Sequence, residues 1–185
     1  MEKLHIFNKI LMRSENENTM LKTCFYQEDG EDAACFDGAL VSIKELRDHD
    51  LYAGMKDLNA RNCTAYDADA PIYGFVDYVD VDGGNISDVR YRIGDKLYNV
   101  QPEAGVHMRV RMVEKGDEFY LGNGCFDVEP EAGKFAVPEA GKCTMKVVNA
   151  IDKSGLCIEI EDVRGLIVGQ INEGHNMYRC RVVSQ

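Results

Sequence analysis

Short apolar-rich segments separated by turn residues fill the chain from about residue 72 to the C-terminus, and this alternation constrains the fold more than any other feature. In several segments apolar and polar residues alternate, as expected for a half-buried β-strand whose successive side chains point to opposite faces. The predicted strands cover residues 72–79, 96–100, 106–113, 118–121, 125–128, 134–137, 143–148, 156–160, 166–168 and 177–183. The series predicts a mainly β protein, an antiparallel β-sandwich or β-barrel with short helical turns and a possible N-terminal arm.

The turns between these strands have explicit chemistry. The tetrapeptide Pro-Glu-Ala-Gly occurs three times, at residues 102–105, 130–133 and 138–141. Proline fixes φ at the entry of a turn and glycine accepts a positive φ at its exit. We interpret the tetrapeptide as a reused turn, and glycine-containing segments at 115–117 and 122–124 predict further tight turns.

The N-terminal third is less regular. Leu4, Phe7, Ile10 and Leu11 have helical spacing, although part of this set also fits a strand. Segment 1–24 is therefore predicted to be either an N-terminal arm or a first strand. Segment 25–185 is predicted to be a β-rich body, a single domain with a possible subdivision near residue 70.

Two local elements are expected in the first part of this body. Ser42 is positioned to cap a helical turn over residues 44–48. Residues 57–70 have the composition of a loop.

Charge and hydropathy exclude two classes of partner. The formal net charge of -11 disfavours direct nucleic-acid binding, which depends on concentrated Lys and Arg. The densest basic group alternates along predicted strands, so it is expected to pair with carboxylates on a sheet face; it consists of Arg90, Arg92, Arg109 and Arg111. No apolar run has the roughly 18 residues of a membrane span, and residues 1–12 lack the pattern of a signal peptide. We expect no membrane contact and synthesis in the cytosol.

The seven cysteines are an odd number and form no Cys-x-x-Cys pair. In a chain expected to stay in the cytosol, they are predicted to be reduced thiols that pack like small hydrophobic residues.

Closely spaced carboxylates between residues 77 and 88 resemble a calcium-binding loop, but the register fails. With Asp80 and Asp82 at positions 3 and 5 of an EF-hand, position 1 would be Tyr78 and position 12 would be Val89. Neither residue supplies the required oxygen ligand, so a structural turn is predicted.

No other motif indicates an active site. The histidines are isolated from one another; they are His5, His49, His107 and His175. His107, on a predicted strand, is the best candidate for a metal site assembled from distant residues, and Cys125 is interpreted as a packed thiol. We predict no catalytic residue, no cofactor and no metal ligand.

From residue 36 onward, the order of local features resembles the small capsid-associated structural proteins of tailed bacteriophages, known as head decoration or cement proteins. The segments that carry the resemblance are residues 36–43, 62–65, 72–79, 91–99, 103–110 and 114–119. The resemblance covers most of the chain up to about Val148 and depends on the order of strands and turns.

The resemblance implies a non-enzymatic virion protein that binds the capsid exterior, with the major capsid protein as partner and a homo-oligomeric state on the capsid. It transfers no functional residue. We expect Leu4, Phe7, Ile10 and Leu11 to form an apolar anchor on the capsid.

Two alternatives stay open. One is a carbohydrate- or small-molecule-binding β-barrel lined by the aromatic residues Tyr73, Phe75, Tyr78 and Tyr98. The other is a small β-barrel enzyme whose site is distributed along the sequence.

Overall fold

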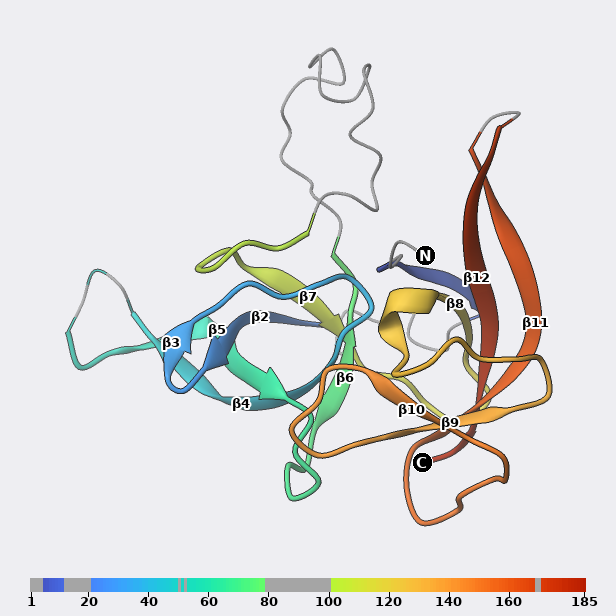
Figure 1. Ribbon diagram of the computed structural model, residues 1–185. Helices are drawn as coiled ribbons and strands as arrows, with labels where there is room; N and C mark the ends of the chain where they lie inside the picture. Colours follow the sequence, from blue (N-terminus) through green and yellow to red (C-terminus); the bar gives the residue numbers. More distant parts are fainter. Residues whose placement is uncertain (1–4, 12–20, 50, 52, 79–100, 169–170) are drawn as a thin grey trace.

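The computed structural model describes residues 5–11, 21–49, 51, 53–78, 101–168 and 171–185. These residues form two six-stranded sheets, which confirms the prediction of a mainly β protein (Figure 1). The first sheet has the order β1 (Phe7–Leu11), β8 (Glu118–Gly122), β12 (Ile171–Ser184), β11 (Cys157–Val168), β9 (Phe135–Pro138) and β10 (Met145–Val148). The second has the order β3 (Glu31–Asp32), β2 (Leu21–Glu28), β5 (Lys56–Ala65), β4 (Leu40–Asp48), β6 (Tyr73–Val76) and β7 (Met108–Arg111).

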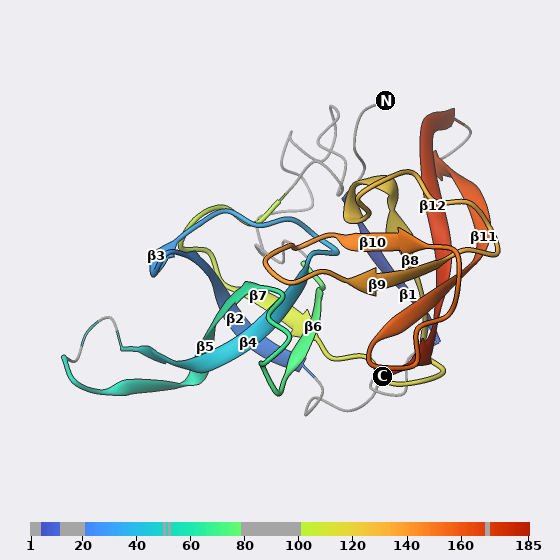
Figure 2. The ribbon, with the colours of Figure 1, turned by 60° about the horizontal axis from the view of Figure 1, so that its bottom comes forward.

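The second sheet closes on itself because β7 also pairs with β2. Strands β2, β5, β4, β6 and β7 thus form a five-stranded barrel, with β3 as a short extension of β2. Every pairing in the two sheets is antiparallel except that of β2 with β5, where Thr23 to Tyr26 run alongside Ala60 to Cys63. Figure 2 shows the barrel on one side and the first sheet on the other.

Apolar side chains fill the barrel interior. They come from alternating positions of its strands, as the two-residue period of a strand requires. The buried set consists of Cys24, Tyr26, Ala39, Val41, Ile43, Cys63, Val76, Met108 and Val110.

A second core joins the barrel to the first sheet. Leu40 and Phe75 turn outward from the barrel and pack with buried residues of the first sheet. The ring of Phe119 lies 5.1 Å from that of Phe7 and 5.2 Å from that of Phe75, centroid to centroid. Because these three rings come from β1, β6 and β8, one apolar cluster binds both sheets together.

The three Pro-Glu-Ala-Gly segments form the same turn, as predicted. In each, the glutamate carbonyl accepts a hydrogen bond from the N–H three residues later, at 3.1–3.2 Å. The glycines Gly105, Gly133 and Gly141 have φ values of 75°, 83° and 77°, which only glycine adopts at low cost in the third position of a type II turn.

Four local predictions are wrong. Residues 44–48 continue β4 as a strand because they pair with β5, and the buried Ser42 hydroxyl bonds to the backbone of Asp67 and caps no helix. Residues 57–65 belong to β5. Residues 122–124 form no positive-φ hairpin and 125–128 form no strand, since β8 runs directly into the 3₁₀ turn η4 (Asn123–Cys125). Several loop-like segments therefore hold strands or turns that only tertiary pairing specifies.

The predicted strand at 96–100, the calcium-like carboxylates beyond Asp77 and the polar stretch at 13–18 lie outside the described residues. The N-terminal alternative of a first strand matches β1, which pairs with β8 from Phe7 opposite Leu121 to Leu11 opposite Glu118.

Gly74 provides a test of the close approach of β6 to β7 in the barrel. A Cβ at this position would lie 2.4 Å from the carbonyl oxygen of Arg111, in the backbone of the neighbouring strand. We expect Gly74→Ala to lower the free energy of unfolding by about 2 kcal/mol or more, because backbone must move to make room. The control is Gly155→Ala, whose Cβ would meet nothing within 4 Å. Urea unfolding of both variants checks this, and an equal loss in the two would contradict it.

Candidate interaction site

The β4–β5 hairpin extends away from the rest of the barrel in both views (Figures 1 and 2). Ion pairs hold its base. Arg47 binds Asp32 of β3 through two N–O contacts of 2.7 Å, and its guanidinium lies 4.1 Å over the ring of Phe25. Lys44 pairs with Asp67 at the other side of the base. The bidentate, ring-stacked arginine fixes the direction in which the hairpin leaves the barrel.

The apex of this hairpin is apolar and exposed. We define the hairpin apex as Leu51, Met55 and Leu58, whose exposed fractions are 81%, 58% and 82%. Single exposed apolar residues are common on protein surfaces. Three within eight residues, on one protruding element, form the kind of patch that marks a contact with another macromolecule.

A backbone hydrogen bond joins the two sides of the hairpin next to the apex. The N–H of His49 donates to the carbonyl of Met55 at 2.9 Å, and Gly54 takes a φ of 82°. The pairing of β4 with β5 is irregular here, since Leu46 faces Arg61 whereas Asp48 faces Lys56. Extra residues on β5 therefore bulge outward, and Leu58 is among them.

The hairpin apex is not predicted from the sequence. The composition of residues 57–70, rich in Asp, Asn and Ala, predicts a loop. The available signal was the recurrence of Leu51, Met55 and Leu58 as isolated large apolar residues within a polar stretch, with no alternating partner that would bury them.

The predicted N-terminal anchor has a different placement. Phe7 is 7% exposed and belongs to the core shared by the two sheets. Ile10 and Leu11 lie in β1, and Leu4 lies outside the described residues. Phe7 is therefore unavailable to any partner while β1 is paired with β8, and the anchor role of Leu4, Ile10 and Leu11 stays a prediction.

A buried carboxylate holds β1 in place. Oδ2 of Asp37 accepts the backbone N–H of Phe7 at 2.8 Å, and Oδ1 accepts that of Tyr78 at 2.9 Å. Burial raises the pKa of this carboxyl to about 7, against the opposing effect of the two N–H donors. Among the described residues, the carboxylate of Asp77 also raises this pKa, and Asp77 is itself paired with Arg111 and Arg109.

Asp77 and Arg111 form a buried ion pair inside the same region. The guanidinium of Arg111 donates to Asp77 Oδ2 from Nε at 3.0 Å and from Nη2 at 2.9 Å, and both side chains are about 5% exposed or less. Arg109 approaches the other carboxylate oxygen at 3.6 Å. Arg109 and Arg111 thus pair with a carboxylate, as predicted, and this carboxylate is that of Asp77. Arg90 and Arg92 lie outside the described residues.

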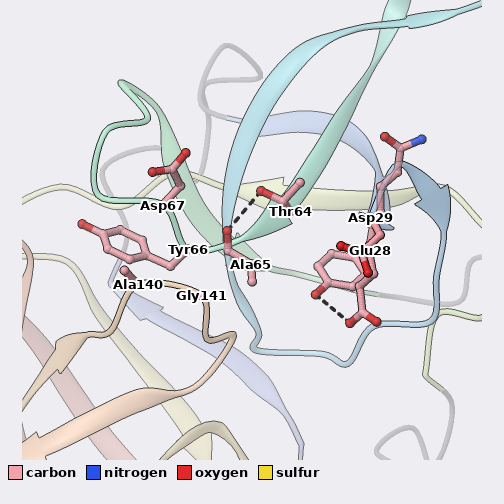
Figure 3. Close-up of a pocket in the computed structure, with 10 residues that line it drawn as sticks. Glu28, Asp29, Thr64, Ala65, Tyr66, Asp67, Ala140 and Gly141 are labelled. Carbon is pink, nitrogen blue, oxygen red and sulfur yellow. Dashed lines mark hydrogen bonds between the residues drawn. The ribbon is translucent and has the colours of Figure 1, made fainter.

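Two surface hollows flank the barrel. The first has a volume of about 510 Å³ and is lined by residues of β2, β5 and the β9–β10 turn (Figure 3). Figure 3 shows Glu28 and Asp29 on one side of it, facing Tyr66, Ala140 and Gly141 on the other. Its polar groups bond among themselves, since the Tyr26 hydroxyl donates to Glu28 at 3.1 Å and Lys44 neutralises Asp67.

The second hollow, of about 650 Å³, includes Ile72, Tyr73, Met112 and Val113. Of the aromatic residues considered for a ligand site, Tyr73 lines this hollow, Phe75 is fully buried, and Tyr78 packs against the barrel core. Tyr98 lies outside the described residues.

The candidate metal and nucleophile residues come together nowhere in the described part of the chain. No group of three or more His, Cys, Asp or Glu side chains there could hold a metal ion. The ring of His107 lies near that of Phe25, at 6.3 Å between centroids. Cys125 is 1% exposed, and burial raises the pKa of its thiol to about 12. Its thiol contacts the backbone carbonyls of Ile6 and Asp37, so it packs as expected.

Comparison with protein-family models, with curated proteins and with solved structures found no match to this chain. Among the described residues, no helix is both long and apolar enough to cross a membrane.

Asp37 predicts a specific dependence of stability on pH. Its pKa is about 7 in the folded protein and close to 3.8 when exposed, so between these values the folded state binds the extra proton. Stability from this group is therefore complete below about pH 4 and is lost as the pH rises through 7. We expect the free energy of unfolding to fall between pH 5 and pH 8 in the wild type, and to fall less in Asp37→Asn.

Chemical denaturation at a series of pH values measures both slopes. Contributions that the two proteins share cancel in the difference between their slopes. Identical slopes for wild type and Asp37→Asn would show that this carboxyl does not titrate there.

Proposed function

We propose that this chain is a non-catalytic structural protein that binds a lattice of major capsid protein on the outside of a bacteriophage head, and that the hairpin apex is a principal contact. The observation that carries the proposal is the exposure of Leu51, Met55 and Leu58 on a protruding hairpin whose base is fixed by ion pairs. The order of strands and turns along the sequence, which resembles that of head decoration proteins, supports the choice of partner.

A protruding hairpin with an apolar apex can insert into an apolar recess of a partner. Burying a leucine or methionine side chain is worth about 1.5–3 kcal/mol. Because Arg47 and Lys44 already order the base, little conformational entropy is lost when the apex docks. Three such side chains provide a modest contact per copy, which suits a protein repeated many times over a shell.

Electrostatics supports an exterior position. A net charge of -11 repels packaged nucleic acid and keeps an unbound protein soluble. The described basic side chains are largely paired with carboxylates, as at Arg179 with Glu118 and Arg181 with Glu159.

The competing proposal is a ligand-binding barrel. The barrel interior is occupied by its own side chains, so a ligand would have to use the open hollows beside Tyr66 or Tyr73. The two hollows are shallow surface features lined by mixed polar and apolar residues, whereas the apex exposes three large apolar side chains on one element.

The test is co-sedimentation of the purified chain with empty capsids assembled from the cognate major capsid protein. We expect the wild type to co-sediment, and Leu51→Asp/Leu58→Asp to bind about 100-fold more weakly, because two apolar contacts are lost. Thermal unfolding of this variant should match the wild type, since both positions are exposed.

The matched control is Val128→Asp/Ile151→Asp, which places the same charges at exposed apolar residues away from the hairpin. It should bind like the wild type. If the wild type does not co-sediment, the proposed partner is wrong; if both double variants bind equally well, the hairpin apex is not the contact. A glycan and metabolite thermal-shift screen tests the ligand-binding alternative.

A further inference from the structure

Four of the seven cysteines gather in and around the barrel as two pairs of neighbouring thiols. Cys24 and Cys63 are fully buried in its interior and lie close enough to influence each other's ionisation. Cys35 and Cys143 are likewise close enough to influence each other, but both are partly exposed where they pack against the barrel core. The two pairs share the same chemistry and differ in access to solvent.

Cys35 and Cys143 come from distant parts of the chain. Cys35 lies between β3 and β4, whereas Cys143 lies between β9 and β10 of the first sheet. Long-range backbone hydrogen bonds position both: the N–H of Cys35 donates to the carbonyl of Pro102 at 3.0 Å, and the carbonyl of Cys143 accepts from Leu40 at 2.8 Å. The fold therefore brings two partly exposed cysteines from distant parts of the chain together beside the barrel core.

Their surroundings distinguish the two sulfur atoms. Interaction with Cys35 is the largest cause that lowers the pKa of Cys143, and the hydroxyl oxygen of Tyr26, which lies 3.4 Å from Cys143 Sγ, adds to this effect. The same contact with Cys143, together with burial, raises the pKa of Cys35. Cys143 is thus the better nucleophile of the two, and Cys35 is placed to resolve a bond formed at Cys143.

We propose that Cys35 and Cys143 are a redox-sensitive pair that forms a disulfide across the junction of the two sheets when the protein meets a low-molecular-weight disulfide such as oxidised glutathione. Cys143 loses its proton to solvent, and its thiolate attacks one sulfur of the oxidant. A mixed disulfide forms and one glutathione thiolate leaves. Cys35 then loses its proton, its sulfur attacks Cys143 Sγ, and the second glutathione thiolate leaves.

The sum of the two steps balances. Two protein thiols are oxidised to one disulfide, one oxidised glutathione is reduced to two glutathione thiols, and the two protons released by the protein end on those thiols. In a reducing compartment the pair stays as two thiols, and in an oxidising one it closes. This inference holds whether or not the chain binds a capsid.

The disulfide would stabilise the folded protein. It would close a loop of roughly 100 residues and tie the barrel directly to the β9–β10 connection, so the unfolded chain would lose much conformational freedom. We expect the melting temperature of the oxidised protein to exceed that of the reduced protein by about 5–15 °C.

The experiment incubates the full chain with oxidised glutathione under native conditions, alkylates the remaining thiols, and maps the peptides by mass spectrometry. We expect a peptide pair linked through Cys35 and Cys143, a rise in melting temperature, and reversal of both by dithiothreitol. Cys24 and Cys63 serve as an internal control, because both are buried and should become alkylated only after unfolding.

Single variants test the assigned roles. Cys35→Ser should accumulate glutathione on Cys143, because no resolving thiol is present, while Cys143→Ser should react about tenfold more slowly at Cys35. Wild-type protein in which Cys35 and Cys143 both remain open to alkylation, or in which either keeps a bound glutathione, would overturn the proposal. A linked pair without a rise in melting temperature would show that the disulfide does not stabilise the fold.

Discussion

The carboxylate of Asp37 is the interaction on which the joint between barrel and sheet depends. It accepts one backbone N–H from β1 and one from the segment that follows β6, so a single side chain connects strands of both sheets. The contact is possible because Gly38, at a φ of 79°, brings the chain within reach of Ile6 and Cys125. The ring cluster of Phe7, Phe75 and Phe119 then packs beside it. A buried polar contact thus sets the position of β1, and the apolar cluster supplies the larger share of the stabilisation.

The sequence predicts the fold class and the turns well, for a physical reason. Alternation along residues 72–79 and 177–183 reflects the side-chain period of a strand, and Pro-Glu-Ala-Gly encodes its own backbone angles. Such signals are local and need no knowledge of the partner strand. They fail at residues 44–48 and 57–65, where Lys, Glu, Asp and Asn form strands only because β4 and β5 pair with each other. Likewise, no local sequence signal near Gly122 predicts that β8 continues directly into the 3₁₀ turn η4.

The candidate site could be predicted only in part. The spacing of apolar residues predicts an exposed anchor at Leu4, Phe7, Ile10 and Leu11, although part of this set also fits a strand. In the structure, Phe7 is buried in the core, whereas Leu51, Met55 and Leu58 are exposed to solvent. The sequence does not predict that Cys35 and Cys143 are neighbours, because they are far apart in the chain and belong to no common motif. Tertiary contacts alone create both features.

The pairing of β1 with β8 has a consequence for synthesis of the protein. Phe7 faces Leu121, so the first strand finds its partner only after more than one hundred further residues have been made. Until then, the nascent chain leaves the ribosome with an apolar segment that has no sheet to join, while the barrel strands β2, β4, β5 and β6 can already meet. A high separation between paired strands slows folding and prolongs the exposure of unpaired edges. The barrel is therefore expected to begin to assemble before β1 pairs with β8.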